Sequence, residues 1–213
     1  MIPTKADETI VYIVDDNEEL RLSLDSLFRS VGLKTQLFES SRDFLVAQRT
    51  ANVSCLVIDV RLPGISGLDF HEQLVQAGSS MPAIFMTGYG DIPMSVRAMK
   101  AGAIDFLVKP FRDQDMLDAV SSALEIDRER RQKDHRSEAL RERLKQLSHR
   151  EKQVMTLVSR GLMNKQIAGE LSLSEVTVKI HRGSMMRKMN AKTLADLIRM
   201  AELLGADRDD FLS

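Results

Sequence analysis

The chain has 213 residues, of which 29% are charged and 43% hydrophobic, a balance that is typical of globular proteins and excludes a disordered chain. No run approaches the roughly 18 consecutive apolar residues of a membrane span, and the first residues lack the apolar core of a signal peptide, so we expect a cytoplasmic protein with no membrane partner. The net charge of −1 is unevenly divided, because residues 1–125 hold 11 Lys and Arg against 18 Asp and Glu, whereas residues 126–213 hold 19 against 13.

The first 125 residues alternate between short runs rich in β-branched residues and amphipathic segments. In the amphipathic segments, apolar residues recur at spacings of three and four and the pattern stops at a glycine, as between Leu20 and Gly32. Strands that alternate with helices predict an α/β doubly wound parallel sheet. The five candidate strands are residues 10–14, 34–38, 55–58, 83–87 and 106–108.

Three of these strands end in charged residues. Asp15-Asp16 follows the first strand, Asp59 follows the third, and Lys109-Pro110 follows the fifth. The carboxyl ends of parallel strands meet at the crevice where ligands bind, so we expect these side chains to lie together. Two carboxylates ~4 Å apart repel by about 4 kcal/mol near a protein surface. Such a cluster needs a cation, and hard oxygen ligands suit Mg²⁺ or Mn²⁺, which together with a lysine would handle a phosphoryl group.

From residue 113 to about residue 147 neither Gly nor Pro interrupts the chain. We interpret this stretch as one long connecting helix, with a flexible linker between two helical ends as the alternative. The run from Asp127 to Arg136 carries charge on every face and is predicted to be solvated. The predicted organisation is a first domain of residues 1–125, a helical linker of residues 126–146 that continues its last helix, and a second domain of residues 147–213.

The last third of the chain is predicted to be all-helical. Ser148-His-Arg-Glu151 is a capping-box pattern that opens a helix. Two short helices joined by Leu171-Ser-Leu173 form a candidate helix-turn-helix. Residues 144–200 hold 11 Lys and Arg against 4 Asp and Glu, which favours contact with a polyanion. Four helices are expected, beginning at or just after Ser148, Asn164, Ser174 and Thr193.

The predicted helix after Ser174 has two distinct faces. Val178, Met185 and Met189 share one side and are expected to pack inward. The second helix of such a motif enters the major groove of DNA, where base edges specify sequence and phosphates fix register. Lys179, Gly183 and Arg187 form a second stripe, flanked by Ile180. We expect base contacts from Lys179 and Ile180, with Arg182 as a substitute where Gly183 offers no side chain. We expect phosphate contacts mainly from Asn164, Lys165, Thr177, Arg187 and Lys188.

Taken in order, these motifs resemble the two-component response regulators, specifically the FixJ-type branch of the NarL/LuxR class, over nearly the whole chain. The front half resembles their flavodoxin-like receiver domain in Asp15-Asp16, Asp59-Val-Arg-Leu-Pro-Gly64, Met86-Thr-Gly88 and Ala101-Gly-Ala-Ile-Asp-Phe-Leu-Val-Lys-Pro-Phe111. The back half resembles their LuxR-type, four-helix DNA-binding domain in Ser148-His-Arg-Glu151, Gly161-Leu-Met-Asn-Lys-Gln-Ile-Ala168 and Glu175-Val-Thr-Val-Lys-Ile-His181. Gly183 departs from many members of the family, which carry a longer polar or basic residue there.

The resemblance implies a role for each residue of the receiver motifs. Asp59 would accept a phosphoryl group from a histidine kinase, and Lys109 would pair with the phosphoryl oxygens. Asp15, Asp16, Asp59 and the backbone carbonyl of Arg61 would hold the metal ion. Thr87 would follow the phosphoryl group when the domain switches, and Phe106 would be the aromatic whose rotamer reports that change. The Lys109-Pro110 bond would be cis, a geometry rare outside X-Pro bonds. An ordinary strand end for Thr87 and plain core packing for Phe106 are the alternatives.

The implied function is a transcription factor that phosphorylation switches on. The phosphorylated protein would dimerise through its fourth and fifth helices and bind promoter DNA, with RNA polymerase as a further partner. It would turn over only its own phosphoryl group and would not be an enzyme with external substrates.

Two other functions remain open at this stage. A Mg²⁺-dependent phosphatase with an aspartyl-phosphate intermediate usually carries an acid two positions after its nucleophile, where this chain has Arg61. An output domain that serves only protein interaction is disfavoured by the basic excess of residues 144–200. DNA binding that falls steeply with salt would distinguish the two kinds of output domain.

Overall fold

The computed structural model describes residues 9–48, 52–88 and 92–204. The chain divides into two compact units, Met1–Arg131 and Gln132–Ser213. The first unit combines a sheet with helices, and the second is helical throughout the residues described.

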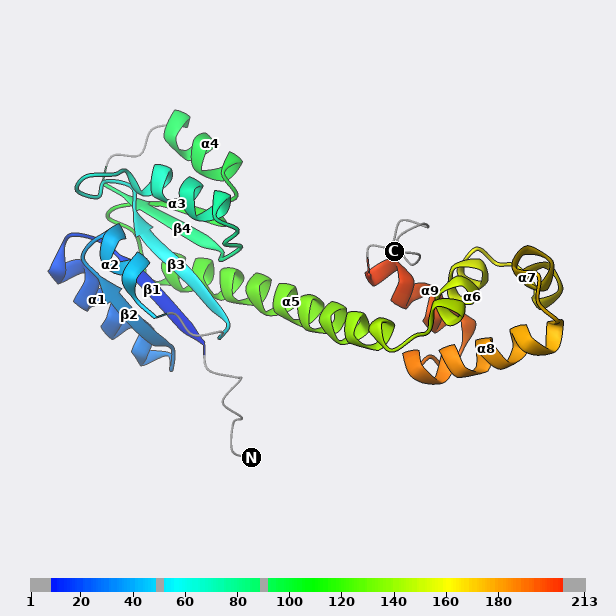
Figure 1. Ribbon diagram of the computed structural model, residues 1–213. Helices are drawn as coiled ribbons and strands as arrows, with labels where there is room; N and C mark the ends of the chain where they lie inside the picture. Colours follow the sequence, from blue (N-terminus) through cyan, green and yellow to red (C-terminus); the bar gives the residue numbers. More distant parts are fainter. Residues whose placement is uncertain (1–8, 49–51, 89–91, 205–213) are drawn as a thin grey trace. The chain divides into compact units, whose positions relative to one another are not determined.

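The first unit contains a sheet of five parallel strands in the order β2-β1-β3-β4-β5 (Figure 1). Every residue of β1, β3 and β4 is buried, as expected where helices cover both faces of a parallel sheet. The predicted doubly wound α/β class is confirmed, and three of the five predicted strands have the predicted bounds. The strands are β1 (Ile10–Val14), β2 (Lys34–Phe38), β3 (Ser54–Asp59), β4 (Ala83–Thr87) and β5 (Asp105–Val108).

Two hydrophobic clusters fill the two faces of the sheet, because successive strand residues point to opposite sides. Tyr12 and Val14 of β1 join the cluster formed with α2, α3 and α4, while Val11 and Ile13 join the cluster formed with α1 and α5. Cys55 belongs to the second cluster and is fully buried. The helices are α1 (Glu18–Ser30), α2 (Ser41–Val46), α3 (Gly67–Gln76), α4 (Ile92–Lys100) and α5 (Asp113–Lys145).

Helix α5 is a single helix of 33 residues that begins in the first unit and ends in the second (Figure 1). The prediction of one continuous connecting helix is therefore confirmed. Within the described ranges, neither α5 nor any other helix is both long and apolar enough to cross a membrane.

The prediction of a fully solvated charged run after residue 126 is wrong for Asp127. Its side chain is completely buried and accepts a hydrogen bond from the Ser54 N–H at 2.9 Å, at the start of β3. Arg130 and Arg131, one turn further along α5, pair with the same carboxylate. Burial opposes the ionised carboxylate, but the hydrogen bonds from the two arginines and from Ser54 hold the pKa of Asp127 below its usual range. This carboxylate therefore ties α5 to the strand that ends in Asp59.

The second unit packs four helices against the last turns of α5. Leu140 and Leu144 of α5 join a core that includes Val154, Ile167 and Leu197. The side chains of Ser148, Ser174 and Thr193 each accept a hydrogen bond from the backbone of the following helix, which confirms three predicted helix starts. These helices are α6 (His149–Ser159), α7 (Asn164–Leu171), α8 (Glu175–Met189) and α9 (Leu194–Leu203).

Candidate functional site

The three carboxylates predicted to converge do lie together at the carboxyl end of the sheet. One oxygen each from Asp15, Asp16 and Asp59 lie within 4.8 Å of one another. Asp15 is fully buried, Asp59 is 7% exposed and Asp16 faces solvent. Asp59 is the last residue of β3, and Asp15 and Asp16 directly follow β1. The parallel register of β1 and β3 brings the two strand ends side by side.

Lys109 completes this cluster from the end of β5. Its ammonium donates hydrogen bonds to Asp15 Oδ2 at 2.7 Å and to Asp59 Oδ2 at 2.6 Å. Burial opposes the charged ammonium, but these two hydrogen bonds raise the pKa of Lys109 above its ordinary value. Burial raises the pKa of Asp15, and the lysine offsets that effect only in part. The Lys109-Pro110 peptide bond is cis, as predicted.

Backbone N–H groups orient the two buried carboxylates. Asn17 donates its N–H to Asp15 Oδ1 at 2.8 Å, and Arg61 donates its N–H to Asp59 Oδ1 at 3.0 Å. Arg21 of α1 donates to the backbone carbonyl of Asp15 at 2.6 Å. The predicted role of the Arg61 carbonyl as a metal ligand stays a prediction.

Gly67, at the start of α3, is a positioning residue that the sequence analysis missed. A Cβ atom at this position would lie 2.1 Å from the backbone oxygen of Asp59, far inside van der Waals contact. The Gly67 N–H donates to the Val60 carbonyl at 2.8 Å, which holds the start of α3 against the end of β3. Two glycines, Gly64 and Gly67, follow Asp59 within eight residues, and this was the one feature of the sequence that could have indicated a close approach of the backbone there.

Thr87 and Phe106, the two residues predicted to switch, lie on the neighbouring strands β4 and β5. Thr87 ends β4 and is fully buried, and its carbonyl accepts a hydrogen bond from the Lys109 N–H at 2.7 Å. Phe106 pairs in register with Phe85 of β4 and is partly buried against the core cluster shared by α2, α3 and α4. Their switching roles stay predictions.

The donor set of this cluster suits a divalent cation. When ionised, the three carboxylates carry three negative charges, and Lys109 pairs with two of them through one positive charge. All three ligand groups are hard oxygens, and exposed Asp16 gives the cluster a side open to water, which Mg²⁺ prefers to retain. The residues present therefore fit the expected metal ion.

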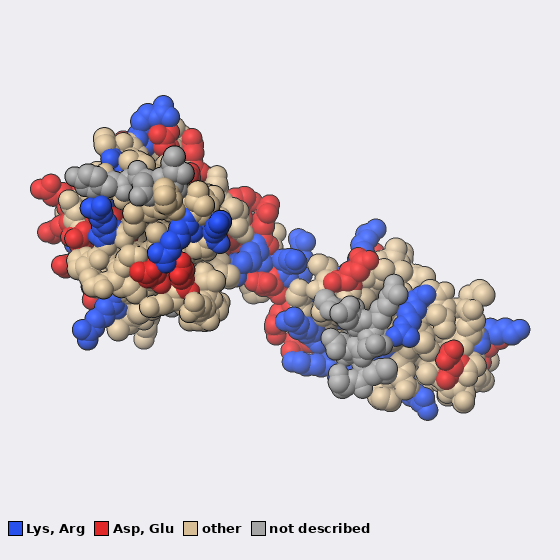
Figure 2. Space-filling view, turned by 90° about the horizontal axis from the view of Figure 1, so that it is seen from above, with Lys and Arg blue, Asp and Glu red and all other residues tan. Residues whose placement is uncertain are grey.

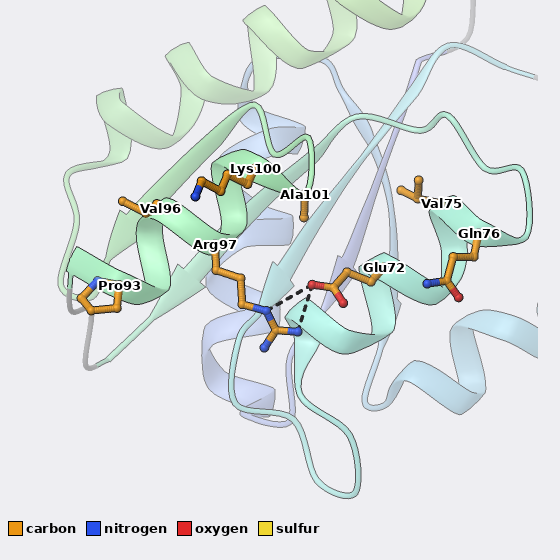
Figure 3. A pocket seen from close by; sticks show the side chains of 8 residues that line it. All are labelled: Glu72, Val75, Gln76, Pro93, Val96, Arg97, Lys100 and Ala101. Atoms are coloured by element: carbon orange, nitrogen blue, oxygen red, sulfur yellow. Dashed lines mark hydrogen bonds and ion pairs between the residues drawn. The ribbon is translucent and has the colours of Figure 1, made fainter.

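The groove of about 730 Å³ between α3 and α4 is separate from the acidic cluster, and none of the three aspartates lines it (Figure 3). Arg97 of α4 reaches across to Glu72 of α3, with Nη2 and Nε at 2.9 and 3.1 Å from Glu72 Oε1. The same guanidinium donates a hydrogen bond to Asp69 at 2.6 Å. This bond from Arg97 holds the pKa of Asp69 below its usual range. Among the described side chains of α4, only Ala98 is buried. The ionic network of Arg97 therefore adds a second link between α4 and α3.

In the second unit, α8 presents the two faces that the sequence predicted. Val178, Met185 and Met189 are fully buried. Lys179, Ile180, Gly183 and Arg187 are exposed. On the face of this unit that Figure 2 shows, Lys and Arg side chains are scattered among uncharged and acidic ones. The predicted DNA-facing residues of α8 therefore lie on its exposed side, and their contact with DNA stays a prediction.

Other predicted DNA contacts have partners within the unit. Arg182 Nη1 donates to Asn164 Oδ1 at 3.0 Å and so links α8 to the start of α7. The Thr177 N–H and hydroxyl both bond with Ser174 Oγ, at 3.0 and 2.8 Å, as part of the cap of α8. Lys165 is exposed on α7.

Lys188 is placed differently from the other predicted phosphate contacts. Its ammonium donates to Glu151 Oε2 at 2.7 Å, and the Glu151 side chain is only 5% exposed. The two residues are 37 positions apart, so no local pattern announced the pair. Lys188 is thus already engaged inside the unit.

Comparisons with known proteins point to one family. Residues 11–121 match the response regulator receiver domain, and residues 145–201 match the bacterial regulatory proteins of the luxR family. Nodulation protein W of Bradyrhizobium diazoefficiens is 55% identical over 198 residues, covering 93% of this chain and 87% of that protein. The transcriptional regulatory protein FixJ of Azorhizobium caulinodans is 45% identical over 202 residues, covering 94% and 95%. The solved structure of the response regulator StyR is 46% identical with a TM-score of 0.82, covering 92% of this chain and 98% of that one.

Proposed function

This chain belongs to the FixJ-type response regulators, which join a receiver domain to a LuxR-type DNA-binding domain, and from that membership we propose that phosphorylation of Asp59 switches its binding to promoter DNA. It is a transcriptional regulator of a two-component system. The phosphoryl donor would be a histidine kinase. Because transcription takes place on the chromosome, the protein would act in the cytoplasm.

The observation that carries this proposal is the convergence of Asp15, Asp16, Asp59 and Lys109. A carboxylate oxygen of Asp59 would attack the phosphorus of the donor, the bond from phosphorus to the leaving group would break, and an acyl phosphate would form. Lys109 would shift its hydrogen bond from Asp59 to a phosphoryl oxygen and offset the charge there. Phosphoryl transfer needs mainly positioning and charge stabilisation, which these residues would supply.

We propose that Asp15, Asp16, Asp59 and the carbonyl of Arg61 hold Mg²⁺, with Mn²⁺ as the alternative. The metal ion would neutralise part of the charge on the phosphoryl oxygens. The protein would turn over only its own phosphoryl group. The alternative of an external phosphatase finds no support at Arg61, which offers a backbone N–H to Asp59 where a phosphatase of this kind has an acid.

The response to phosphorylation would pass through Thr87 and Phe106 to the surface of α4 and α5 and favour a homodimer. Two DNA-binding domains could then occupy half-sites about one turn, ~34–36 Å, apart, and contact RNA polymerase. We propose Lys179 and Ile180 as base contacts. For phosphates we propose Asn164, Lys165, Thr177 and Arg187. Lys188 stays in this set, with its ammonium already paired with Glu151. Arg182, whose guanidinium is bonded to Asn164, stays only the substitute predicted for the side chain missing at Gly183.

The direct test of the phosphoacceptor is labelling with radioactive acetyl phosphate in the presence of Mg²⁺. Asp59→Asn should abolish labelling, because an amide cannot form the acyl phosphate. Asp118→Asn, which changes an exposed aspartate on α5, should label like the wild type. Chelation of the metal should suppress labelling of both proteins. Undiminished labelling of Asp59→Asn would refute the assignment.

A further inference from the structure

Three large apolar side chains of the second unit are unusually exposed. Met163, Val176 and Ile180 are 68%, 69% and 65% exposed. The other large hydrophobic residues described as exposed in this unit, Leu194 and Leu203, are only 37% and 40% exposed. Single exposed apolar residues are ordinary, but two of these three lie on the helix that faces DNA.

Val176 and Ile180 lie on one stripe of α8. They are four residues apart, Gly183 follows three positions later, and Arg187 four positions after that, which places all four on one side of the helix. The buried residues Val178, Met185 and Met189 occupy the opposite side. The apolar pair therefore lies at the centre of the exposed face and in its amino-terminal half, the part of a recognition helix that contacts base edges.

The surroundings of this pair fit the major groove of DNA. Lys179 and Arg187 lie beside it on the same helix, so two cations flank the pair on α8. A Cβ atom on Gly183 would meet no atom within 4 Å, so this position leaves open space in which the helix can approach the bases closely. A cationic rim suits the phosphates, whereas an apolar centre suits the one apolar group that the major groove displays, the C5-methyl of thymine.

We propose that Val176 and Ile180 read the C5-methyl groups of thymines in each half-site. This inference rests on the proposed binding of DNA through α8, and it adds the chemistry that is recognised. Gly183 supplies no hydrogen bond, and Arg182 is bonded to Asn164, so Lys179, beside the apolar pair, provides the polar base contact. Sequence preference then depends on methyl groups as much as on hydrogen bonds.

The test removes single methyl groups from the DNA and changes nothing else. The phosphorylated full-length protein first selects duplexes from a random pool. Each thymine of the most enriched duplex is then replaced by deoxyuridine, one position at a time, and affinity is measured by fluorescence anisotropy. We expect about fourfold weaker binding at one or two positions in each half-site, the factor for one buried methyl group.

Protein variants assign the effect to the two side chains. Ile180→Ala and Val176→Ala should each lose discrimination between thymine and deoxyuridine at one position. Val46→Ala, at a valine that is 77% exposed on α2, should keep the full discrimination pattern. Lys179→Ala should weaken binding but keep the methyl effect. Both recognition-helix side chains are exposed, so circular dichroism should show that the variants fold like the wild type.

Four other results would overturn either methyl recognition by Val176 and Ile180 or the proposed function. Equal affinity for all deoxyuridine duplexes would overturn methyl recognition while leaving DNA binding intact. A methyl effect that persists in both alanine variants would assign it to another side chain and also overturn the proposal. If the apolar pair instead contacts RNA polymerase or a second copy of the chain, the variants would lose activation or dimerisation with an unchanged deoxyuridine pattern. A selection that enriches no sequence would contradict the proposed function itself.

Discussion

Glu151 shows how a residue outside the proposed DNA contacts supports the DNA-binding unit. Its carboxylate closes the capping box of α6 by accepting the Ser148 N–H at 2.7 Å, and it pairs with Lys188 of α8. Burial alone would raise its pKa, but hydrogen bonds from Lys188, Ser184 and Ser148 lower the pKa of Glu151 from 4.5 to about 2. One side chain thus joins α6 to α8, two helices of the second unit.

This lowered pKa predicts an acid-sensitive second unit. The ionised form is favoured in the folded state, so the stabilisation is present above pH 4.5 and is lost as the pH falls towards 2. The loss should be on the order of 2–3 kcal/mol. Urea unfolding of the full chain, followed by NMR signals of the second unit at several pH values, measures it. Glu151→Gln should flatten this dependence, whereas Glu170→Gln, at an exposed position on α7, should not. Equal slopes for Glu151→Gln and wild type would contradict the account.

Tyr12 presents the opposite case, a buried polar group that lacks a partner. Its ring packs against Phe38 and Phe44 at centroid distances of 6.3 and 5.6 Å. No group within the described residues hydrogen-bonds its buried hydroxyl. Removing the hydroxyl in Tyr12→Phe should raise the free energy of unfolding of the receiver by about 1 kcal/mol. Tyr12→Leu should lower it, because the aromatic contacts are lost. A destabilised Tyr12→Phe protein in chemical denaturation would show that the hydroxyl has a partner after all.

Sequence patterns revealed the charged residues of the receiver site but not their supports. Asp15, Asp59 and Lys109 could be predicted because each ends a recognisable strand and parallel strand ends converge. The Glu151–Lys188 pair could not, because it joins residues distant in sequence. Gly67 was missed because its role depends on how closely α3 approaches Asp59, which only the folded backbone reveals.

Among the elements, α5 is the one whose surroundings differ most from its sequence pattern. A run of charged residues predicted solvent on every side, yet Asp127 is buried against the start of β3. The absence of Gly and Pro from residue 113 to about residue 147 identified the helix correctly. The sequence pattern could not show that Asp127 is buried, because Arg130 and Arg131, which pair with it, make the whole segment look polar.

Asp127→Ala should destabilise the receiver. The Ser54 N–H would lose its acceptor, and Arg130 and Arg131 would each lose their ion pair with this carboxylate. We expect a loss of about 2–3 kcal/mol in the free energy of unfolding. Hydrogen exchange by mass spectrometry should also show faster exchange at the start of β3. Asp118→Ala, on the exposed side of α5, is the control and should leave both measurements unchanged. Unchanged protection at Ser54 in Asp127→Ala would refute the proposed tie.

The molecule as a whole combines an acidic receiver with a basic DNA-binding unit. The uneven charge and the change from alternating strands and helices to helices alone revealed this division in the sequence. What composition could not reveal is how far α5 belongs to the first unit, because that depends on the buried tie at Asp127. The central claim is that a phosphoryl group on Asp59 in the first unit controls DNA binding by the second.

The most direct test measures the affinity of the full-length protein for its selected DNA with and without acetyl phosphate and Mg²⁺, at one fixed salt concentration. Wild-type protein should bind more tightly after phosphorylation, and its affinity should fall steeply as salt is raised. Asp59→Asn should bind weakly and equally under both conditions. An affinity of the wild type that phosphorylation leaves unchanged, or a gain that persists in Asp59→Asn, would contradict the account.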